Sequence, residues 1–318
     1  MSTFIETAFT GGERIRRMQA MLLLRAFEEA LLRQTKPGFQ LLSRGEEAVA
    51  VGICAALELR DPFLCSGRSI GPALARGVPP GALLAELVGK DGGPNRGRAG
   101  RGHVSMPSIG FFGAHAVVGG NLTVAAGVAL AQQQLATGAV ALCLFGDGAC
   151  GSGALHETLN LSALWHLPLV LVCSNNGYAV STPVRAALAP ARLTDFALPF
   201  GIRAQQVDGS DVDLVAEAVA AAVAEARAGR GPSFLEMRCA RLGTHSTLTP
   251  EKRPPEELEE LGARDPLALY ERRLRAEGVL DDALAASLRA EVHAQIAGAE
   301  QAAAAAPWPD GKEAVADA

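Results

Sequence analysis

The sequence predicts an α/β fold with a parallel sheet flanked by helices. Two short apolar runs, at 139–145 and 167–173, are typical of buried parallel strands. Segments with helical spacing alternate with these runs, which is the pattern of strand–helix–strand units. Hydrophobic residues make up 49% of the 318 residues, enough to build the core of one large domain or two ordinary ones.

The first third of the chain is mainly helical by its apolar spacing. A helix is expected over 12–34, where apolar residues recur every three or four positions. Ser43 and Glu46 have the spacing of a capping box, which predicts that a second helix begins at Ser43 and continues to about residue 59. A short strand over 62–66 follows, and the Gly-rich stretch 89–113 is expected to be a long loop.

Strands and helices then alternate regularly along the chain. The expected segments are a helix at 122–135, a strand at 139–145, a helix at 153–164, a strand at 167–173, a strand at 201–207, a helix at 212–228 and a strand at 233–239. We therefore expect a helical extension over 1–40, one α/β domain over 41–245, a helical region over 246–306 and a flexible tail over 307–318.

Composition excludes several classes of function. The net charge of −5 provides no basic field for nucleic acid or an anionic membrane. No apolar run approaches the roughly 20 residues that span a bilayer, and the acidic residues near the amino terminus argue against a secretory signal. The six cysteines are scattered without a CxxC pair, so we expect a cytoplasmic protein with reduced thiols.

One pair of motifs carries chemistry. Gly146-Asp147-Gly148 comes directly after one predicted buried strand, and Asn175-Asn176 comes directly after the next, with 26 residues between Gly148 and Asn175. Because the carboxyl ends of parallel strands meet at one edge, both motifs are expected at a single ligand site. The glycines permit a tight turn, and the helix that follows directs its amino end at the same place, which suits a phosphate.

Oxygen ligands at this edge predict a small cation. Asp147 and the amide oxygen of Asn176, with a backbone carbonyl just after Asn176, suit a Mg²⁺ ion that also holds phosphate oxygens. Each motif alone is more often a simple turn or loop, but the two together at strand ends favour the functional interpretation.

The motifs resemble the thiamine diphosphate motif, and their surroundings resemble one family. NLSALWHLPLVLVCSNNGYAVSTP is similar to the alpha subunit of the decarboxylating component of 2-oxo acid dehydrogenase complexes. The resemblance runs nearly end to end, through RGEEAVAVG, ALARGVPPGALLAEL, AVVGGNLTVAAGVALA, RLGTHSTLTP and RDPLALY. NNGYAVSTP and RLGTHST resemble the branched-chain type.

The resemblance implies roles for particular residues and the cofactors thiamine diphosphate and Mg²⁺. Asp147, Asn176 and the Tyr178 carbonyl would bind Mg²⁺. The diphosphate would be held by the backbone N–H groups of Gly148 and Ala149 and by the guanidinium of Arg68. The aminopyrimidine would lie against the backbones of Ala116 and Val118, and His245 would be the catalytic residue near the diphosphate and the substrate entrance.

The chain departs from the family pattern near two of these residues. Gly67 and Ile70 replace residues of the usual pocket, Thr244 stands where relatives often have a histidine, and His103 and His115 are alternative proton donors or simple loop side chains.

Cys150, just after the phosphate turn, is either a small packed residue or a reactive thiol. Arg96, Arg98 and Arg101 either face solvent or order against the diphosphate or a partner chain.

The resemblance also implies partners. In this family a glutamate of a separate beta subunit activates the cofactor, so two alpha and two beta chains are expected to act on a small 2-oxo acid, with a lipoyl acyltransferase as a possible acceptor. An acetoin dehydrogenase falls within this first interpretation. A carboligase without lipoyl transfer is the alternative, kept open by Gly67 and Ile70. A non-catalytic partner subunit and half of a split transketolase are weaker alternatives.

Overall fold

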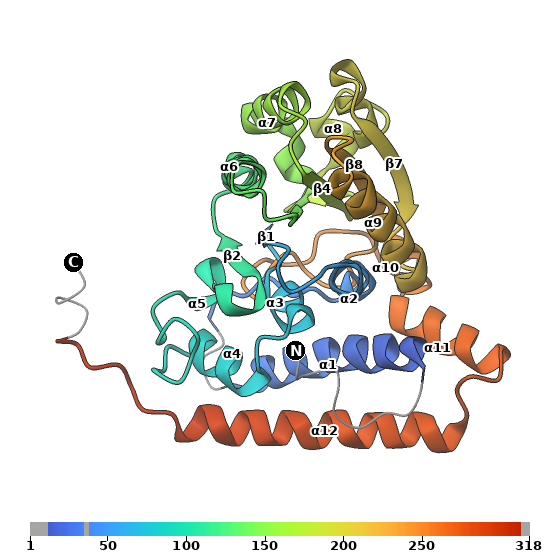
Figure 1. Cartoon of the computed structure of the whole chain (residues 1–318). Helices are drawn as coiled ribbons and strands as arrows, with labels where there is room; N and C mark the ends of the chain where they lie inside the picture. The colour runs from blue at the N-terminus through green and yellow to red at the C-terminus, as the bar shows by residue number, and fades with distance from the viewer. Residues whose placement is uncertain (1–11, 35–37, 313–318) are drawn as a thin grey trace.

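A six-stranded sheet forms the centre of the computed structural model, which describes residues 12–34 and 38–312 (Figure 1). The strand order is β2-β1-β3-β4-β8-β7, and every pairing in this sheet is parallel. The strands are β1 (Phe63–Ser66), β2 (Phe111–His115), β3 (Ala141–Gly146), β4 (Leu169–Asn175), β7 (Arg203–Asp208) and β8 (Ser233–Arg238). The predicted α/β fold with a parallel sheet is confirmed.

Helices cover both faces of this sheet because its side chains alternate in direction. Leu142 and Leu144 of β3 join a core with α2 (Glu47–Ala56) and α9 (Val212–Arg227). Cys143, between them, joins a second core on the opposite face. That second core includes residues of α6 (Gly120–Gln134) and α7 (Gly153–Leu164). Both faces are apolar, as a doubly covered parallel sheet requires.

The two ends of the chain form a further layer of helices. α1 (Glu13–Arg33) and α12 (Asp282–Ala305) lie side by side below the first core in Figure 1. The remaining α-helices of the described residues are α3 (Ile70–Arg76), α4 (Pro80–Leu87), α5 (Gly100–His103), α8 (Val184–Ala187), α10 (Pro255–Gly262) and α11 (Pro266–Ala276). Within the described ranges, the search for a helix both long and apolar enough to cross a membrane finds none.

The capping-box prediction is wrong in its detail. α2 begins at Glu47, and neither Ser43 nor Glu46 makes a side-chain cap. The Ser43 hydroxyl instead accepts a hydrogen bond from the Gly71 backbone N–H at 3.2 Å. Its own backbone N–H donates to the buried carboxyl group of Glu28, at 2.5 Å. Contacts with α1 and α3 thus replace the local cap.

The Gly-rich stretch 89–113 is more ordered than predicted. It contains α5 and the first residues of β2, so the prediction of a single long loop is wrong at its carboxyl end. Glu86 of α4 is fully buried and organises the stretch. Its carboxylate accepts backbone N–H groups from Asn95 at 2.9 Å, Gly97 at 3.0 Å, Ala99 at 2.8 Å and Gly100 at 3.2 Å.

Two of the three arginines in that stretch make contacts that their sequence positions left open. Arg96 pairs with Asp91 at 2.9 Å. Arg101 donates to the Phe39 carbonyl at 2.8 Å and lies over the Phe39 ring. Both arginines therefore order against this chain itself.

The carboxyl-terminal segment after α12 returns to the α4 region. The Asp91 backbone N–H donates to the Pro307 carbonyl at 2.9 Å, and the Lys90 ammonium lies 5.4 Å from the Trp308 ring centre. Residues 307–312 have no regular structure, and the rest of the predicted tail lies outside the described residues. The predicted division into domains stays a prediction.

We expect Glu86→Gln to lower the free energy of unfolding by about 3 kcal/mol, because a neutral amide faces several buried backbone donors. Urea unfolding measures this loss, and amide exchange should accelerate at residues 95–100. Glu217→Gln, on the exposed face of α9, serves as the control and should change stability by less than about 0.5 kcal/mol. Equal stabilities of the two variants would contradict the role assigned to Glu86.

Candidate functional site

The predicted site residues gather at the carboxyl edge of the sheet. Arg68 follows β1, Asp147 begins the short 3₁₀ helix η2 (Asp147–Gly151) after β3, Asn176 follows β4, and His245 lies beyond β8. A cavity of about 200 Å³ lies among them. Its walls include Arg68, Val118, Asp147, Gly148, Ala149, Asn176, Tyr178 and His245, whereas Ala116 is not among its lining residues.

Asp147 is a buried carboxyl group with an unused oxygen. Its side chain is only 2% exposed, and its Oδ2 atom has no hydrogen-bond partner. Burial raises the pKa of Asp147 to about 6, with a further contribution from the nearby Glu46 charge. The backbone N–H groups of Gly148, Gly177 and Tyr178 oppose this rise by favouring the ionised form.

The two asparagines at the carboxyl end of β4 have different surroundings. Asn176 donates from Nδ2 to the Glu46 carboxylate at 2.8 Å, and its Oδ1 accepts the Tyr178 backbone N–H at 3.2 Å. Asn175 has both ends of its amide committed, donating to Glu236 at 2.7 Å and accepting from the Gly177 backbone N–H at 3.0 Å. Asn176, and not Asn175, therefore lines the cavity that contains Asp147.

The Tyr178 carbonyl is a third oxygen at this edge. Tyr178 pairs with Pro183 in the two-stranded hairpin of β5 (Tyr178–Ala179) and β6 (Thr182–Pro183). Proline has no N–H to donate, so this ladder position does not occupy the carbonyl. Asp147, Asn176 and Tyr178 thus provide one carboxylate, one amide oxygen and one carbonyl oxygen.

This donor set fits Mg²⁺. Among the described residues no group of three or more His, Cys, Asp or Glu side chains could hold a metal, so a cage made only of such groups is absent there. Mg²⁺ commonly binds through one or two carboxylates and keeps water or substrate phosphate oxygens as its remaining ligands. The partnerless Oδ2 atom of Asp147 is the observation that this assignment explains.

The turn after β3 leaves room for a diphosphate. A Cβ atom added at Gly146 would meet nothing within 4 Å, so the backbone there faces open space. A Cβ at Gly148 would lie 2.9 Å from the Ala179 side chain, which explains the second glycine. The amino end of α7 follows this turn within a few residues and favours negative charge.

Arg68 lines the cavity, and three of its five N–H donors contact this chain. Its Nε pairs with Glu46 at 3.2 Å, one Nη donates to the Leu42 carbonyl, and the other donates to the His245 carbonyl at 3.2 Å. Each Nη keeps a second N–H, and a contact between Arg68 and a diphosphate stays a prediction.

His245 is uncharged at neutral pH. Partial burial, then the positive charges of Arg68, Arg241 and Arg101, lower the pKa of His245 to about 4. A neutral imidazole has one donor and one acceptor nitrogen, so His245 can exchange hydrogen bonds with a substrate but adds no charge to the cavity.

Several candidates from the sequence lie outside the cavity. Neither His103 nor His115 lines it, although their rings contact each other at 6.3 Å. Ile70 is 2% exposed and belongs to the core. Cys150 is fully buried with its sulfur 3.7 Å from that of Cys173, which confirms the packed rather than the reactive interpretation.

Sequence reasoning missed two polar residues of the cavity wall. Glu46 was assigned to a helix cap, and Ser174 was given no role. Their side chains meet at 2.7 Å although they are 128 positions apart, so no local pattern could have paired them.

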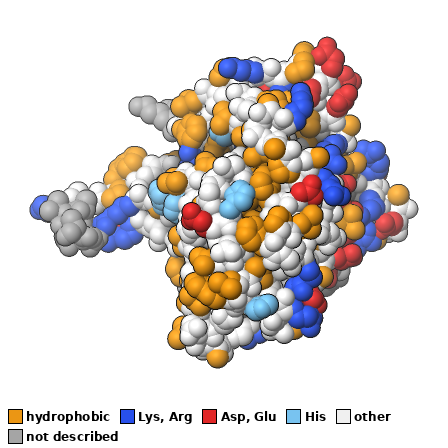
Figure 2. Space-filling view, turned by 90° about the horizontal axis from the view of Figure 1, so that it is seen from above, with side chains coloured by type: hydrophobic (Ala, Val, Ile, Leu, Met, Phe, Trp, Pro, Cys, Tyr) orange, Lys and Arg blue, Asp and Glu red, His pale blue; other side chains and the backbone are white. Residues whose placement is uncertain are grey.

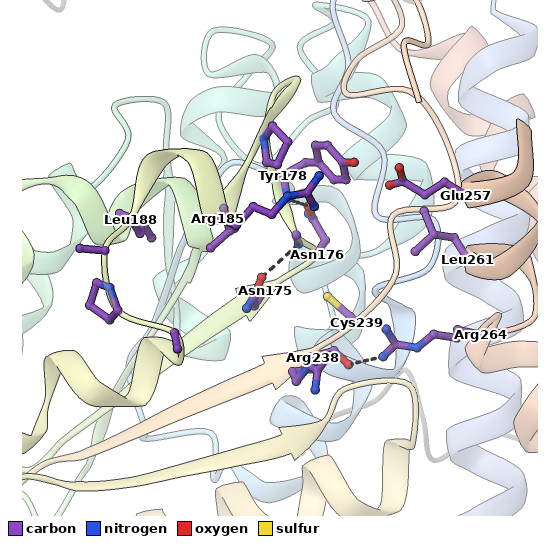
Figure 3. Close-up of a pocket in the computed structure, with 16 residues that line it drawn as sticks. Asn175, Asn176, Tyr178, Arg185, Leu188, Arg238, Cys239, Glu257, Leu261 and Arg264 are labelled. Carbon is purple, nitrogen blue, oxygen red and sulfur yellow. Dashed lines mark hydrogen bonds between the residues drawn. The ribbon is translucent and has the colours of Figure 1, made fainter. Parts of the chain in front are cut away.

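A larger cavity shares Asn176 and Tyr178 with the first among its lining residues (Figure 3). Its volume is about 460 Å³, and Arg185, Glu257 and Arg264 are among its lining residues. Asp147 and His245 do not line it, so the larger cavity is not the one that contains the candidate metal-binding and catalytic residues.

We expect Asp147→Asn to stabilise the metal-free chain. The folded chain binds this proton more tightly than the unfolded chain, because the pKa rises from 3.8 to about 6. The ionised group therefore destabilises the fold increasingly as the pH rises above 3.8, and the effect is complete above about pH 6. The gain should be about 3 kcal/mol at pH 7.5 and fall to about 1 kcal/mol at pH 4.5.

Chemical unfolding at both pH values without divalent metal measures the gain. Asp310→Asn, at an exposed position, is the control and should be neutral. A lower stability of Asp147→Asn than wild type at pH 7.5 would refute this account of the burial.

Comparison with known proteins gives a consistent result. The pyruvate dehydrogenase E1 component subunit alpha of Zymomonas mobilis is 37% identical over 300 residues, covering 92% of this chain and 84% of its own. The alpha subunit of acetoin:2,6-dichlorophenolindophenol oxidoreductase of Cupriavidus necator is also 37% identical, covering 93% of this chain and 91% of its own. The corresponding Bacillus subtilis subunit is 40% identical over 222 residues, covering 69% of this chain and 67% of its own.

The family match covers nearly the whole chain. The dehydrogenase E1 component family matches residues 16–312. The relatives named here are of the pyruvate and acetoin types, so the likeness to the branched-chain type stays a prediction from two motifs. By this match and these identities, the chain belongs to the dehydrogenase E1 component family.

Proposed function

We propose that the chain is the alpha subunit of a thiamine diphosphate- and Mg²⁺-dependent 2-oxo acid dehydrogenase. The observation that carries this proposal is the partnerless, buried Oδ2 of Asp147 in a cavity shared with Asn176 and Tyr178. When bound, thiamine diphosphate supplies a nucleophilic carbon that makes decarboxylation of a 2-oxo acid possible. This chain's residues hold the metal and diphosphate, and neutral His245 exchanges hydrogen bonds at the substrate entrance.

A separate beta subunit completes the active site. Among the residues that line the cavity the only glutamate is Glu46, and its carboxylate already contacts Ser174, Asn176 and Arg68. No glutamate of this cavity wall is free, which agrees with the family resemblance, by which a glutamate of the beta subunit activates the cofactor. We propose an assembly of two alpha and two beta chains.

The exposed apolar surface supports a partner of this kind. Val117 and Val118, next to the cavity, are 62% and 67% exposed. Figure 2 shows hydrophobic side chains gathered across one face of the molecule, with charged side chains mainly toward its edges. An exposed apolar area of this type indicates a protein interface.

A small 2-oxo acid is the proposed substrate class, with acetoin as the variant that two of the named relatives suggest. A lipoyl acyltransferase is the proposed acceptor of the acyl unit. The carboligase alternative has lost part of its support because Ile70 lies in the core and outside the cavity. We also propose a cytoplasmic location, which agrees with six free cysteines.

We expect the purified chain alone to be inactive and its complex with the beta subunit to be active. The assay supplies thiamine diphosphate, Mg²⁺ and 2,6-dichlorophenolindophenol as electron acceptor, with pyruvate, 3-methyl-2-oxobutanoate or acetoin in parallel. Turnover by the isolated chain would refute the shared active site. Acyloin formation without dye reduction by the complex would favour the carboligase.

We expect Asp147→Ala to abolish Mg²⁺-dependent binding of thiamine diphosphate to the complex, because it removes the carboxylate ligand. Calorimetry should show at least a 100-fold loss of affinity, about 2.7 kcal/mol. Asp310→Ala is the control and should bind as wild type does. Unchanged binding by Asp147→Ala would rule out the metal role.

A further inference from the structure

Glu46 connects three parts of the cofactor cavity through one buried carboxylate. Its Oε2 accepts the Ser174 hydroxyl at 2.7 Å, and its Oε1 accepts the Asn176 amide at 2.8 Å. The Arg68 Nε lies 3.2 Å from the same Oε1. The residue is 8% exposed and makes no helix cap, so its carboxylate serves these contacts alone among the described residues.

The contact with Asn176 fixes which end of the amide faces the cavity. A carboxylate accepts but does not donate, so it can pair only with the NH₂ group of Asn176. The Oδ1 atom therefore points away from Glu46, where its recorded partner is the Tyr178 backbone N–H at 3.2 Å. A flipped amide would place two acceptors against each other and offer donors to a cation.

Glu46 also places a carboxylate beside the proposed metal ligands. Its Oε1 accepts the Asn176 amide at 2.8 Å and lies 3.2 Å from the Arg68 Nε. A buried carboxylate next to a cation site favours the cation through space without being one of its ligands.

We propose that Glu46 is a positioning residue for Mg²⁺: it holds the Asn176 oxygen toward the metal and adds a nearby carboxylate charge that favours the cation. This inference rests on the proposed function, since it assumes that Asp147, Asn176 and Tyr178 bind Mg²⁺. Ser174 and Arg68 keep the carboxylate in place, and Glu46 itself does not contact the reacting atoms.

The test measures thiamine diphosphate binding to the alpha–beta complex by calorimetry at a series of Mg²⁺ concentrations. Glu46→Ala should raise the half-saturating Mg²⁺ concentration at least about tenfold while binding remains saturable. Glu46→Gln, which keeps the shape but loses the charge, should raise it at least about threefold and is the variant used if Glu46→Ala does not fold.

Two controls separate positioning from structural support. Ser174→Ala keeps the charge and the Asn176 contact but removes one of the groups that hold the carboxylate, so it should raise the half-saturating Mg²⁺ concentration less than Glu46→Ala does. Glu236→Gln removes another buried carboxylate, 2% exposed and bonded to Asn175, and should lower stability without moving the half-saturation.

The inference is overturned if the half-saturating Mg²⁺ concentration of Glu46→Ala lies within twofold of the wild-type value. If only Glu46→Gln folds, the same criterion applies to that variant. An equal shift in Glu236→Gln also overturns the inference, since that result indicates a general structural effect. Wild-type complex that binds thiamine diphosphate without Mg²⁺ overturns the proposed metal site itself, so the two failures are distinguishable.

Discussion

Parallel pairing of β1, β3, β4 and β8 is the constraint on which the site depends. It brings the carboxyl ends of these strands to one edge, so turns that are far apart in the chain meet there. Arg68 and His245 are 177 positions apart, yet the guanidinium of one donates to the carbonyl of the other at 3.2 Å. The helices on both faces hold this edge in place by burying the apolar side chains of the strands.

Opposite charges lie close together in the cavity wall. The guanidinium of Arg68 pairs with Glu46 at 3.2 Å and donates to the His245 carbonyl at 3.2 Å. Burial of Asp147 would strengthen its contact with a metal. In the metal-free chain the same burial destabilises the fold, so one carboxyl group favours metal binding and disfavours folding. His245 has no such conflict, because at neutral pH it is uncharged and its burial does not remove a charge from water.

Much of this arrangement could be predicted from the sequence because its signals are local. The apolar runs of β3 and β4 and the turns that follow them stand next to each other in the chain, so Asp147 and Asn176 were placed correctly at one edge. The edge strand β2 was missed because it is only five residues long and follows a Gly-rich stretch. Glu46 was misassigned because its partners, Ser174 and Asn176, come from a distant strand end. The bonds that Arg68 makes to the Leu42 and His245 carbonyls could not be predicted, because every residue has a backbone carbonyl and its residue type does not show which one accepts a hydrogen bond.

The contact between Lys90 and Trp308 has a practical consequence for spectroscopy. The sequence has two tryptophans; Trp308 lies beside Lys90, Trp165 ends α7, and neither lines the cofactor cavity. Intrinsic tryptophan emission therefore reports on the carboxyl-terminal segment and on the far end of α7. A dye, a calorimeter or a tryptophan introduced near Tyr178 is needed to see the cofactor arrive.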